Sequence, residues 1–133
     1  MRDNRRLVLA ILAAGLGAAL LVAGATAWLR HRDRQGVAVA REWARLAQLP
    51  ASAANLTVRR AGGMFAREFV VTFNAPLLDI NAWLARSPGT RGRTPRIEDG
   101  TETYRIRPAR GAQFAEVVVH RPSRAVRIRV YWS

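Results

Sequence analysis

The sequence predicts an α+β fold in which an N-terminal transmembrane helix precedes a small domain with two helices and a mainly antiparallel sheet of about five strands. An uncharged apolar run opens the chain, two later segments show helical spacing, and the second half alternates apolar and polar residues as strands do. Half of the 133 residues are apolar, which excludes a disordered chain of low hydrophobicity. We therefore expect one compact domain after the apolar run.

Residues 7–29 form the apolar run, and they are long enough as a helix to cross a hydrocarbon core of roughly 30 Å. Arginines flank the run in residues 1–6 and in the juxtamembrane segment 30–35, and Trp28 lies at one end, where aromatic rings favour the membrane interface. We expect a retained signal anchor. A cleaved signal peptide is the alternative, because residues 25–27 (Ala-Thr-Ala) resemble a cleavage site.

The arginines near the span bear on its orientation. More of them follow the span than precede it, which taken alone places the domain in the cytoplasm. A short basic N-terminus resists export, however, and a domain of this size is translocated largely regardless of its charge. We favour a single-pass membrane protein with an extracytoplasmic domain, and a cytoplasmic domain is the alternative.

The domain is expected over residues 36–133 and begins with an amphipathic helix. Apolar side chains recur at helical spacing through residues 37–49, and Pro50 ends the pattern. The pattern allows this helix to continue directly from the membrane span. We expect Trp43 and Leu46 to pack into the domain core rather than along lipid headgroups.

Two strands are expected next, at residues 56–60 and 64–73. They are joined by a tight turn in which Gly62 can supply a positive φ. In the second strand Phe65 lies on the same face as the apolar residues that follow at every second position, with Arg67 as the one interruption. We therefore expect a half-buried antiparallel strand with a frayed beginning.

A second helix is predicted to begin around Pro76, with Asn74 as its N-terminal cap. Ser87 begins a Ser-Pro-Gly sequence that ends this helix, and residues 87–100 then form an arginine-rich loop. Loops of this length are either functional or solvated connections. We favour a solvated linker, and a flexible anion-binding segment is the alternative.

Three more strands are expected, at residues 102–107, 113–120 and 125–132. The last two form a hairpin whose turn contains Pro122, which suits the second position of a type I turn. If Arg121 pairs with Arg124, every inward pair is apolar, which supports this register. The pairs are Val119 with Val126, Val117 with Ile128, and Ala115 with Val130.

The other face of these strands is basic. Its predicted members are Arg105, Arg107, Arg127, Arg129 and Tyr131. The register sets Glu116 opposite Arg129, so we expect an ion pair there. Arginine stems often cover an exposed sheet while their charges stay in water, and this is the structural explanation of the pattern. The functional one is a surface for anionic headgroups of the membrane lipid bilayer or for an acidic membrane-protein partner, in keeping with a net charge of +13.

The residues of common catalytic and metal sites are scarce. The chain has no cysteine, and its two histidines, His31 and His120, do not form a metal-ligand motif. We expect no cofactor, no metal and no catalysis, and hence a non-catalytic binding or assembly module. One alternative is a small envelope enzyme of hydrolase type that uses His120 with Ser123. The other is a cytoplasmic-facing nucleic-acid-binding module, which we disfavour because no nucleic-acid-binding motif accompanies the arginines and aromatics.

Overall fold

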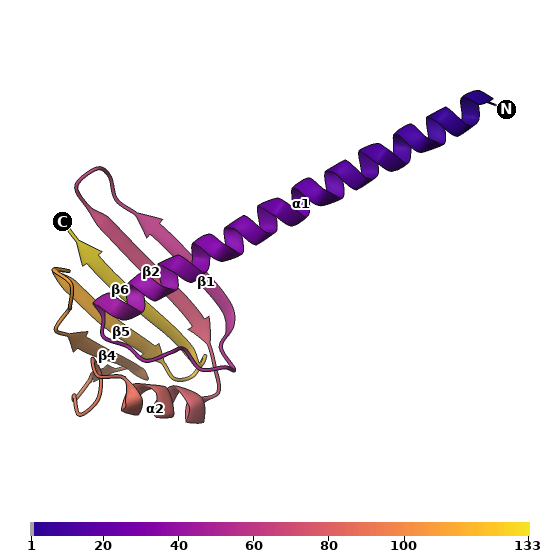
Figure 1. The fold of residues 1–133 in the computed structure, drawn as a ribbon. Coiled ribbons are helices and arrows are strands. Elements are labelled where there is room, and N and C mark those ends of the chain that lie inside the picture. The colour runs from indigo at the N-terminus through magenta and orange to yellow at the C-terminus, as the bar shows by residue number, and fades with distance from the viewer. Residues whose placement is uncertain (1) are drawn as a thin grey trace. The chain divides into compact units, whose positions relative to one another are not determined.

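The computed structural model describes residues 2–133, and the side chains of residue 5 and of residues 7–133. It has an α+β fold, with six strands rather than five (Figure 1). The helices are α1 (Arg2–Trp43) and α2 (Leu77–Arg86). The strands are β1 (Ala54–Ala61), β2 (Arg67–Asn74), β3 (Arg96–Glu98), β4 (Thr101–Ile106), β5 (Phe114–His120) and β6 (Ala125–Trp132).

Helix α1 belongs to two compact units, one that ends at Arg34 and one that runs from Gln35 to Ser133. Its N-terminal part is long and apolar enough to cross a membrane. The apolar side chains of this part are exposed, because no other described segment of the chain covers them. Length and composition do not separate a membrane span from a signal sequence, because a signal sequence near the N-terminus has the same properties. The predicted membrane-spanning helix is thus confirmed in its length and apolar character.

The predicted amphipathic helix is shorter than expected. It is the last part of α1, and it ends at Trp43 rather than at residue 49. Arg45 has a φ of 55°, in the left-handed region that ends a helix. Leu46 nevertheless turns into the core, where it is 6% exposed, and Trp43 packs against the same cluster. The prediction that both residues pack into the core is confirmed.

All neighbouring strands of the sheet are antiparallel, in the order β1-β2-β6-β5-β4-β3. Strand β6 therefore lies in the middle, although it comes last of the six strands in the sequence. The predicted register of β5 and β6 is confirmed, including Val117 opposite Ile128. Their turn closes with a hydrogen bond from the Arg124 N–H to the Arg121 carbonyl oxygen, 3.1 Å apart.

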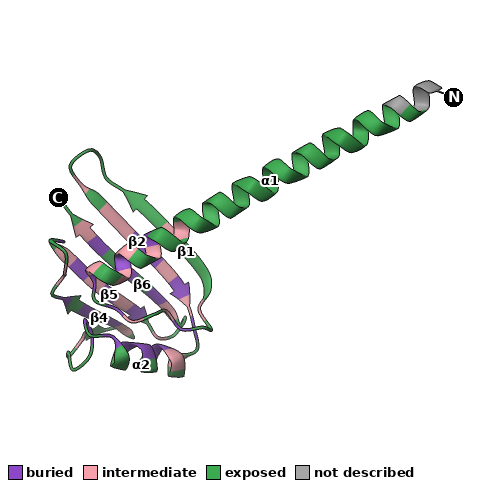
Figure 2. Ribbon diagram, in the orientation of Figure 1, coloured by how far each residue is buried: buried purple, intermediate pink, exposed green. Residues whose placement is uncertain are grey.

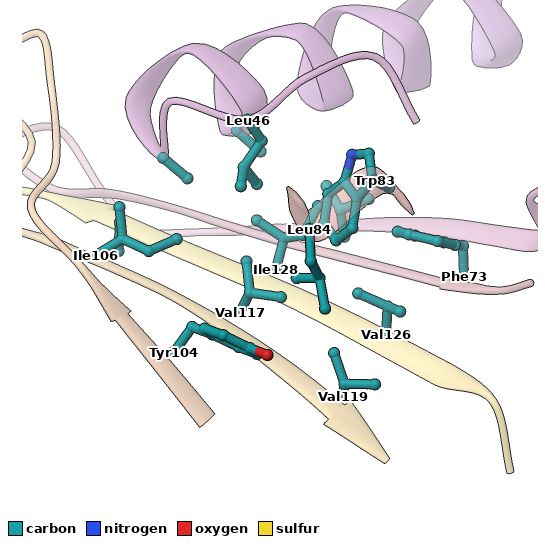
Figure 3. Packing of buried hydrophobic residues seen from close by; sticks show 14 of the residues in the cluster. Leu46, Phe73, Trp83, Leu84, Tyr104, Ile106, Val117, Val119, Val126 and Ile128 are labelled. Atoms are coloured by element: carbon teal, nitrogen blue, oxygen red, sulfur yellow. The ribbon is translucent and has the colours of Figure 1, made fainter. Parts of the chain in front are cut away.

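One face of the sheet is covered by α2 and by the part of α1 that follows Gln35 (Figure 2). Trp83 of α2 is fully buried, and its ring meets Phe73 of β2 edge to face, with centroids 5.6 Å apart. Figure 3 shows the side chains of β5 and β6, such as Val117 and Ile128, pointing toward these helices. The core of the domain is this single layer between helices and sheet.

Two predictions about the turn between β1 and β2 have different outcomes. Gly62 has the expected positive φ, 121°, and a Cβ there would overlap the Ala66 carbonyl. The loop closes only at Ala66, so β2 begins at Arg67 instead of residue 64. The predicted place of Phe65 in this strand is therefore wrong: Phe65 lies in the loop and is 80% exposed.

The segments on either side of α2 also differ from the prediction. No side chain caps the N-terminus of α2, and Asn74 instead donates a hydrogen bond to the Ser123 carbonyl oxygen over 3.2 Å. The arginine-rich loop begins with two buried hydroxyls, on Ser87 and Thr90, both hydrogen-bonded to carbonyls of α2. It then forms strand β3, which was not predicted. The loop is thus tied to the domain rather than a simple solvated linker.

Candidate functional site: the arginine face of the sheet

The face of the sheet turned away from the helices, here called the outer face, carries the predicted arginines. Arg105 of β4 and both Arg127 and Arg129 of β6 alternate with core residues and are exposed. Tyr131 follows on β6 and is half-buried, and Arg107 lies exposed just past the end of β4. Since β5 pairs with both β4 and β6, the two arginine-bearing strands are separated by a single strand.

An aromatic ring lies among these arginines. Phe114 of β5 is opposite Tyr131 in the register. The guanidinium carbons of Arg105 and Arg129 lie 4.7 and 5.3 Å from the centroid of the Phe114 ring. Each such cation–π contact contributes about 0.5 to 1 kcal/mol at an exposed site. Phe114 therefore holds two guanidinium groups, one from each neighbouring strand, close to the sheet.

The ion pairs on the outer face differ from the expected one. Glu116 is opposite Arg129 as predicted, but the carboxylate that binds Arg129 is Glu68 of β2. Its hydrogen bond to the guanidinium raises the pKa of Arg129 further above its already high ordinary value. Glu116 lies 4.0 Å from Arg127 instead. The expected Glu116–Arg129 ion pair is wrong, because β2 brings a second carboxylate to the other side of β6.

In the described part of the chain two of the predicted arginines are uncompensated, meaning here that neither forms an ion pair, although Glu116 lies opposite Arg105 in the register. Within residues 5 and 7–133, no carboxylate forms an ion pair with Arg105 or Arg107. A fifth arginine on this face was not predicted: Arg59 of β1 is opposite Val70, which is opposite Arg129. The alternation of residues in β1 could have indicated that Arg59 faces outward. That Arg59 lies beside the other arginines depends on the order of the strands in the sheet, which alternation does not reveal.

A hollow of about 660 Å³ lies on the β3 side of the outer face. Its lining residues are Arg96, Glu98, Asp99, Thr101, Thr103, Arg105 and Glu116. Carboxylates outnumber arginines in this lining, so the outer face carries both signs of charge side by side. Among the described side chains there is no group of three or more that could hold a metal ion.

A second charged cluster is buried at the opposite face. Glu102 accepts hydrogen bonds from Arg121 Nε and Nη2, at 2.6 and 3.0 Å, and from the Tyr104 hydroxyl at 3.1 Å. The Arg121 guanidinium holds the pKa of Glu102 below its usual range, and burial raises the pKa of Tyr104. Because the charges of Glu102 and Arg121 cancel and their polar atoms are satisfied, this cluster is a structural element.

His120 and Ser123, the residues of the hydrolase alternative, are in contact. His120 Nδ1 lies 2.6 Å from Ser123 Oγ, and both residues are exposed at the turn between β5 and β6. Ser123 lines a hollow of about 510 Å³ whose lining does not include His120. Within residues 5 and 7–133, the His120 side chain has no carboxylate hydrogen-bonded to it that would orient it as a base.

The outer face thus combines uncompensated arginines, an aromatic ring that holds two of the guanidinium groups, and carboxylates at fixed positions between them. Such a surface can recognise a ligand that presents negative charge in a matching pattern. The chain matches no protein-family model, no curated protein sequence and no solved structure.

Proposed function

We propose that the protein is a non-catalytic binding module, that residues 7–29 anchor it in a membrane, and that its outer face binds an acidic segment of a membrane-protein partner. The observation that carries the proposal is Arg105 beside the Phe114 ring on an uncovered sheet face, with Arg107 exposed two residues further along the chain; neither arginine forms an ion pair within the described residues. An antiparallel sheet can pack one face on the core and leave the other in water, so this face, with its exposed charged and aromatic groups, is available for a partner.

A protein partner suits this face better than a lipid surface does. A bilayer presents a layer of one sign of charge, which would also meet the carboxylates of Glu68, Glu98 and Glu116. A protein can place its own carboxylates against Arg105 and Arg107 and avoid the acidic positions. Complementary charges of both signs fix the register of binding as well as its strength.

The aromatic residues supply the apolar part of the contact. Phe114 and Tyr131 face each other across β5 and β6 and are both half-buried. Tyrosine, phenylalanine and arginine are enriched at the centres of protein interfaces, where they lose water on binding. The proposed partner segment therefore carries carboxylates around a small apolar side chain.

The membrane anchor and an extracytoplasmic domain remain part of the proposal. The support for anchoring is the length and the exposed apolar surface of α1 before Arg34. The short basic N-terminus favours export of the domain. An extracytoplasmic domain has no access to nucleic acid, which agrees with a protein partner.

Photo-crosslinking from the outer face tests the partner class. Thr103 of β4 is half-buried, lines the hollow on the outer face and lies two residues before Arg105 on the same strand, so Thr103→p-benzoylphenylalanine places a reactive group on the outer face beside Arg105. We expect a discrete protein adduct in intact cells, weakened by salt. The same probe at Leu78 of α2, which is 79% exposed, should give no such adduct.

Matched arginine variants test whether charge drives the contact. Arg105→Ser with Arg107→Ser should abolish the adduct, while Arg91→Ser with Arg93→Ser, which removes the same charge from the loop after α2, should preserve it. A lipid adduct or a nuclease-sensitive adduct at position 103 would contradict the proposed partner class. Equal effects of the two double variants would show that net charge, rather than the outer face, governs binding.

A further inference from the structure

The loop between β1 and β2 exposes two large apolar side chains that the fold leaves uncovered. Met64 is 91% exposed and Phe65 is 80% exposed. They lie next to each other in the segment 62–66, here called the hairpin tip. Neither belongs to the hydrophobic core cluster, so packing within the domain does not account for them.

The hairpin tip is held in a defined shape. The strands on either side pair up to Ala61 and Glu68, and Gly62 closes the loop against the Ala66 carbonyl with a φ of 121°. A residue with a side chain cannot replace Gly62 without overlap with that carbonyl. Met64 is thus presented at the end of a structured hairpin rather than on a free segment.

Basic and aromatic groups surround the tip. Arg59 and Arg60 lie just before Ala61, the last residue of β1, and Arg67 begins β2. Arg67 is opposite Trp132 of β6, which is 39% exposed. Arginine and tryptophan behind protruding apolar side chains form the pattern of an interfacial membrane contact, in which phosphates bind the arginines and the apolar groups enter the acyl boundary.

The tip also lies near the place where the domain connects to the apolar run. Gly36 approaches β1 so closely that a Cβ on it would lie 2.6 Å from Val58 Cγ1 and 3.2 Å from Arg60 Nη2. Arg60 is separated from the tip by one residue. Residues 30–36 connect Leu29 to this point, at most roughly 25 Å of fully extended chain. A tether this short limits how far the domain can move from the bilayer if residues 7–29 are anchored.

We propose that the hairpin tip is a second membrane contact, which inserts Met64 and Phe65 into the interfacial region of an anionic bilayer. The proposal rests on the proposed membrane anchor, but it concerns the hairpin tip and Arg59 at the β1 end of the outer face, not the proposed partner site on β4, β5 and β6. Its ligand is the lipid surface itself: acyl chains for Met64 and Phe65, and headgroup phosphates for Arg59 and Arg67. The domain is then held at the membrane at two points, which limits the directions in which its outer face can turn.

Site-directed spin labelling of the full chain tests the contact directly. The chain has no cysteine, so Met64→Cys creates a unique labelling site and leaves Phe65 in place. Leu78→Cys is the matched control, because Leu78 is an exposed apolar residue beyond the other end of β2, a strand of about 27 Å at roughly 3.4 Å per residue. Both proteins are reconstituted in vesicles of phosphatidylcholine mixed with phosphatidylglycerol, and unfolding curves confirm that they fold alike.

The readout is the collision of the label with oxygen, which concentrates in the bilayer, and with a water-soluble nickel chelate. We expect oxygen to dominate at position 64 and nickel to dominate at position 78. Adding Arg59→Ser and Arg67→Ser to the Met64→Cys protein, or using phosphatidylcholine alone, should shift position 64 toward the nickel-accessible state.

Several results would overturn the proposal. One is a nickel-accessible label at position 64 like that at 78. Another is a label shielded from both reagents, which indicates a protein contact such as a second copy of the chain. If the oxygen and nickel accessibility of the label at position 64 is the same in charged and uncharged vesicles, the proposed role of the arginines is contradicted. Alkaline extraction of the vesicles tests the membrane anchor separately. If the chain stays in the vesicles but position 64 is exposed to water, only the contact of the hairpin tip is refuted. If the chain is extracted although position 64 is immersed, only the anchor is refuted.

Discussion

The buried ion pair of Glu102 and Arg121 offers the most demanding test of the structure, through the substitution Arg121→Ala. The side chain of Glu102 is only 12% exposed and that of Arg121 33%. Removing Arg121 leaves the carboxylate with the hydroxyl of Tyr104 as its remaining side-chain donor. Loss of one partner of a buried pair costs about 3 to 5 kcal/mol. Because a third of the Arg121 side chain is in water, we expect about 3 kcal/mol, a large part of the roughly 5 to 15 kcal/mol that stabilises a domain.

The pH dependence distinguishes this cause from a general packing defect. In the folded protein Arg121 lowers the pKa of Glu102, so the stabilisation is present above the ordinary carboxyl pKa and is lost as the pH falls through the lowered value. In the variant, burial without the guanidinium favours the protonated carboxyl. The difference in the free energy of unfolding between the two proteins should therefore shrink from neutral pH to a pH below about 4.

Urea unfolding of the full chain in detergent, followed by near-ultraviolet circular dichroism, measures this difference at each pH. The control is Arg91→Ala, because Arg91 lines the same hollow as Arg121 but is exposed and has no carboxylate partner in the described part of the chain. It should change the free energy of unfolding by less than about 0.5 kcal/mol. If Arg121→Ala lowers the free energy of unfolding by an equally small amount, or by an amount that does not change with pH, then Glu102 is not left as a buried, unpaired carboxylate in the variant and the reasoning is refuted.

Substitutions at three further positions probe the core and the outer face by the same unfolding measurement. Gly89→Ala places a Cβ against a neighbouring backbone carbonyl oxygen and should destabilise the domain by about 1 to 3 kcal/mol; an unchanged midpoint would contradict this close approach. Ser87→Ala removes the acceptor of the Ala47 N–H, 3.0 Å away, and should cost about 1 to 3 kcal/mol, whereas Ser87→Thr tests whether a hydroxyl alone is enough. Glu68→Gln breaks the exposed ion pair with Arg129 and should cost less than about 1 kcal/mol; a larger loss would mean that the pair is shielded from water.

The sequence predicted correctly those parts of the fold that depend on contacts between residues close together in the chain. The hairpin of β5 and β6 has a short turn, so its length and the apolar pairing of residues such as Val117 and Ile128 leave one consistent register. Strand β3 was missed for the converse reason: its residues Arg96–Glu98 are few and all exposed, so they show no alternation. The error at Phe65 also has a local cause, since alternation does not reveal how many residues a glycine turn includes.

The outer face was predicted only in part because its composition depends on the order of the strands. The arginines of β4 and β6 were placed correctly, since β5 joins them through the chain. Glu68 and Arg59 reach this face through β2 and β1, which lie on the other side of β6. That neighbourhood follows from contacts between distant segments, and no pattern within either segment indicates it. The Glu68–Arg129 ion pair could therefore not be predicted from the sequence.

The central position of β6 has a consequence for synthesis of the chain on the ribosome. Before β6 emerges, the sheet consists of two separate pieces. One piece contains β1 and β2, and the other contains β3, β4 and β5. The two pieces cannot pair with each other, because β6 lies between them in the sheet. The core side chains Val126, Ile128 and Val130 are also still missing. The nascent domain therefore stays open until its final strand is made, a state in which it can still be threaded through a narrow channel. A polypeptide that stops before residue 125 would leave two unjoined sheet fragments, both with unpaired edges prone to aggregation.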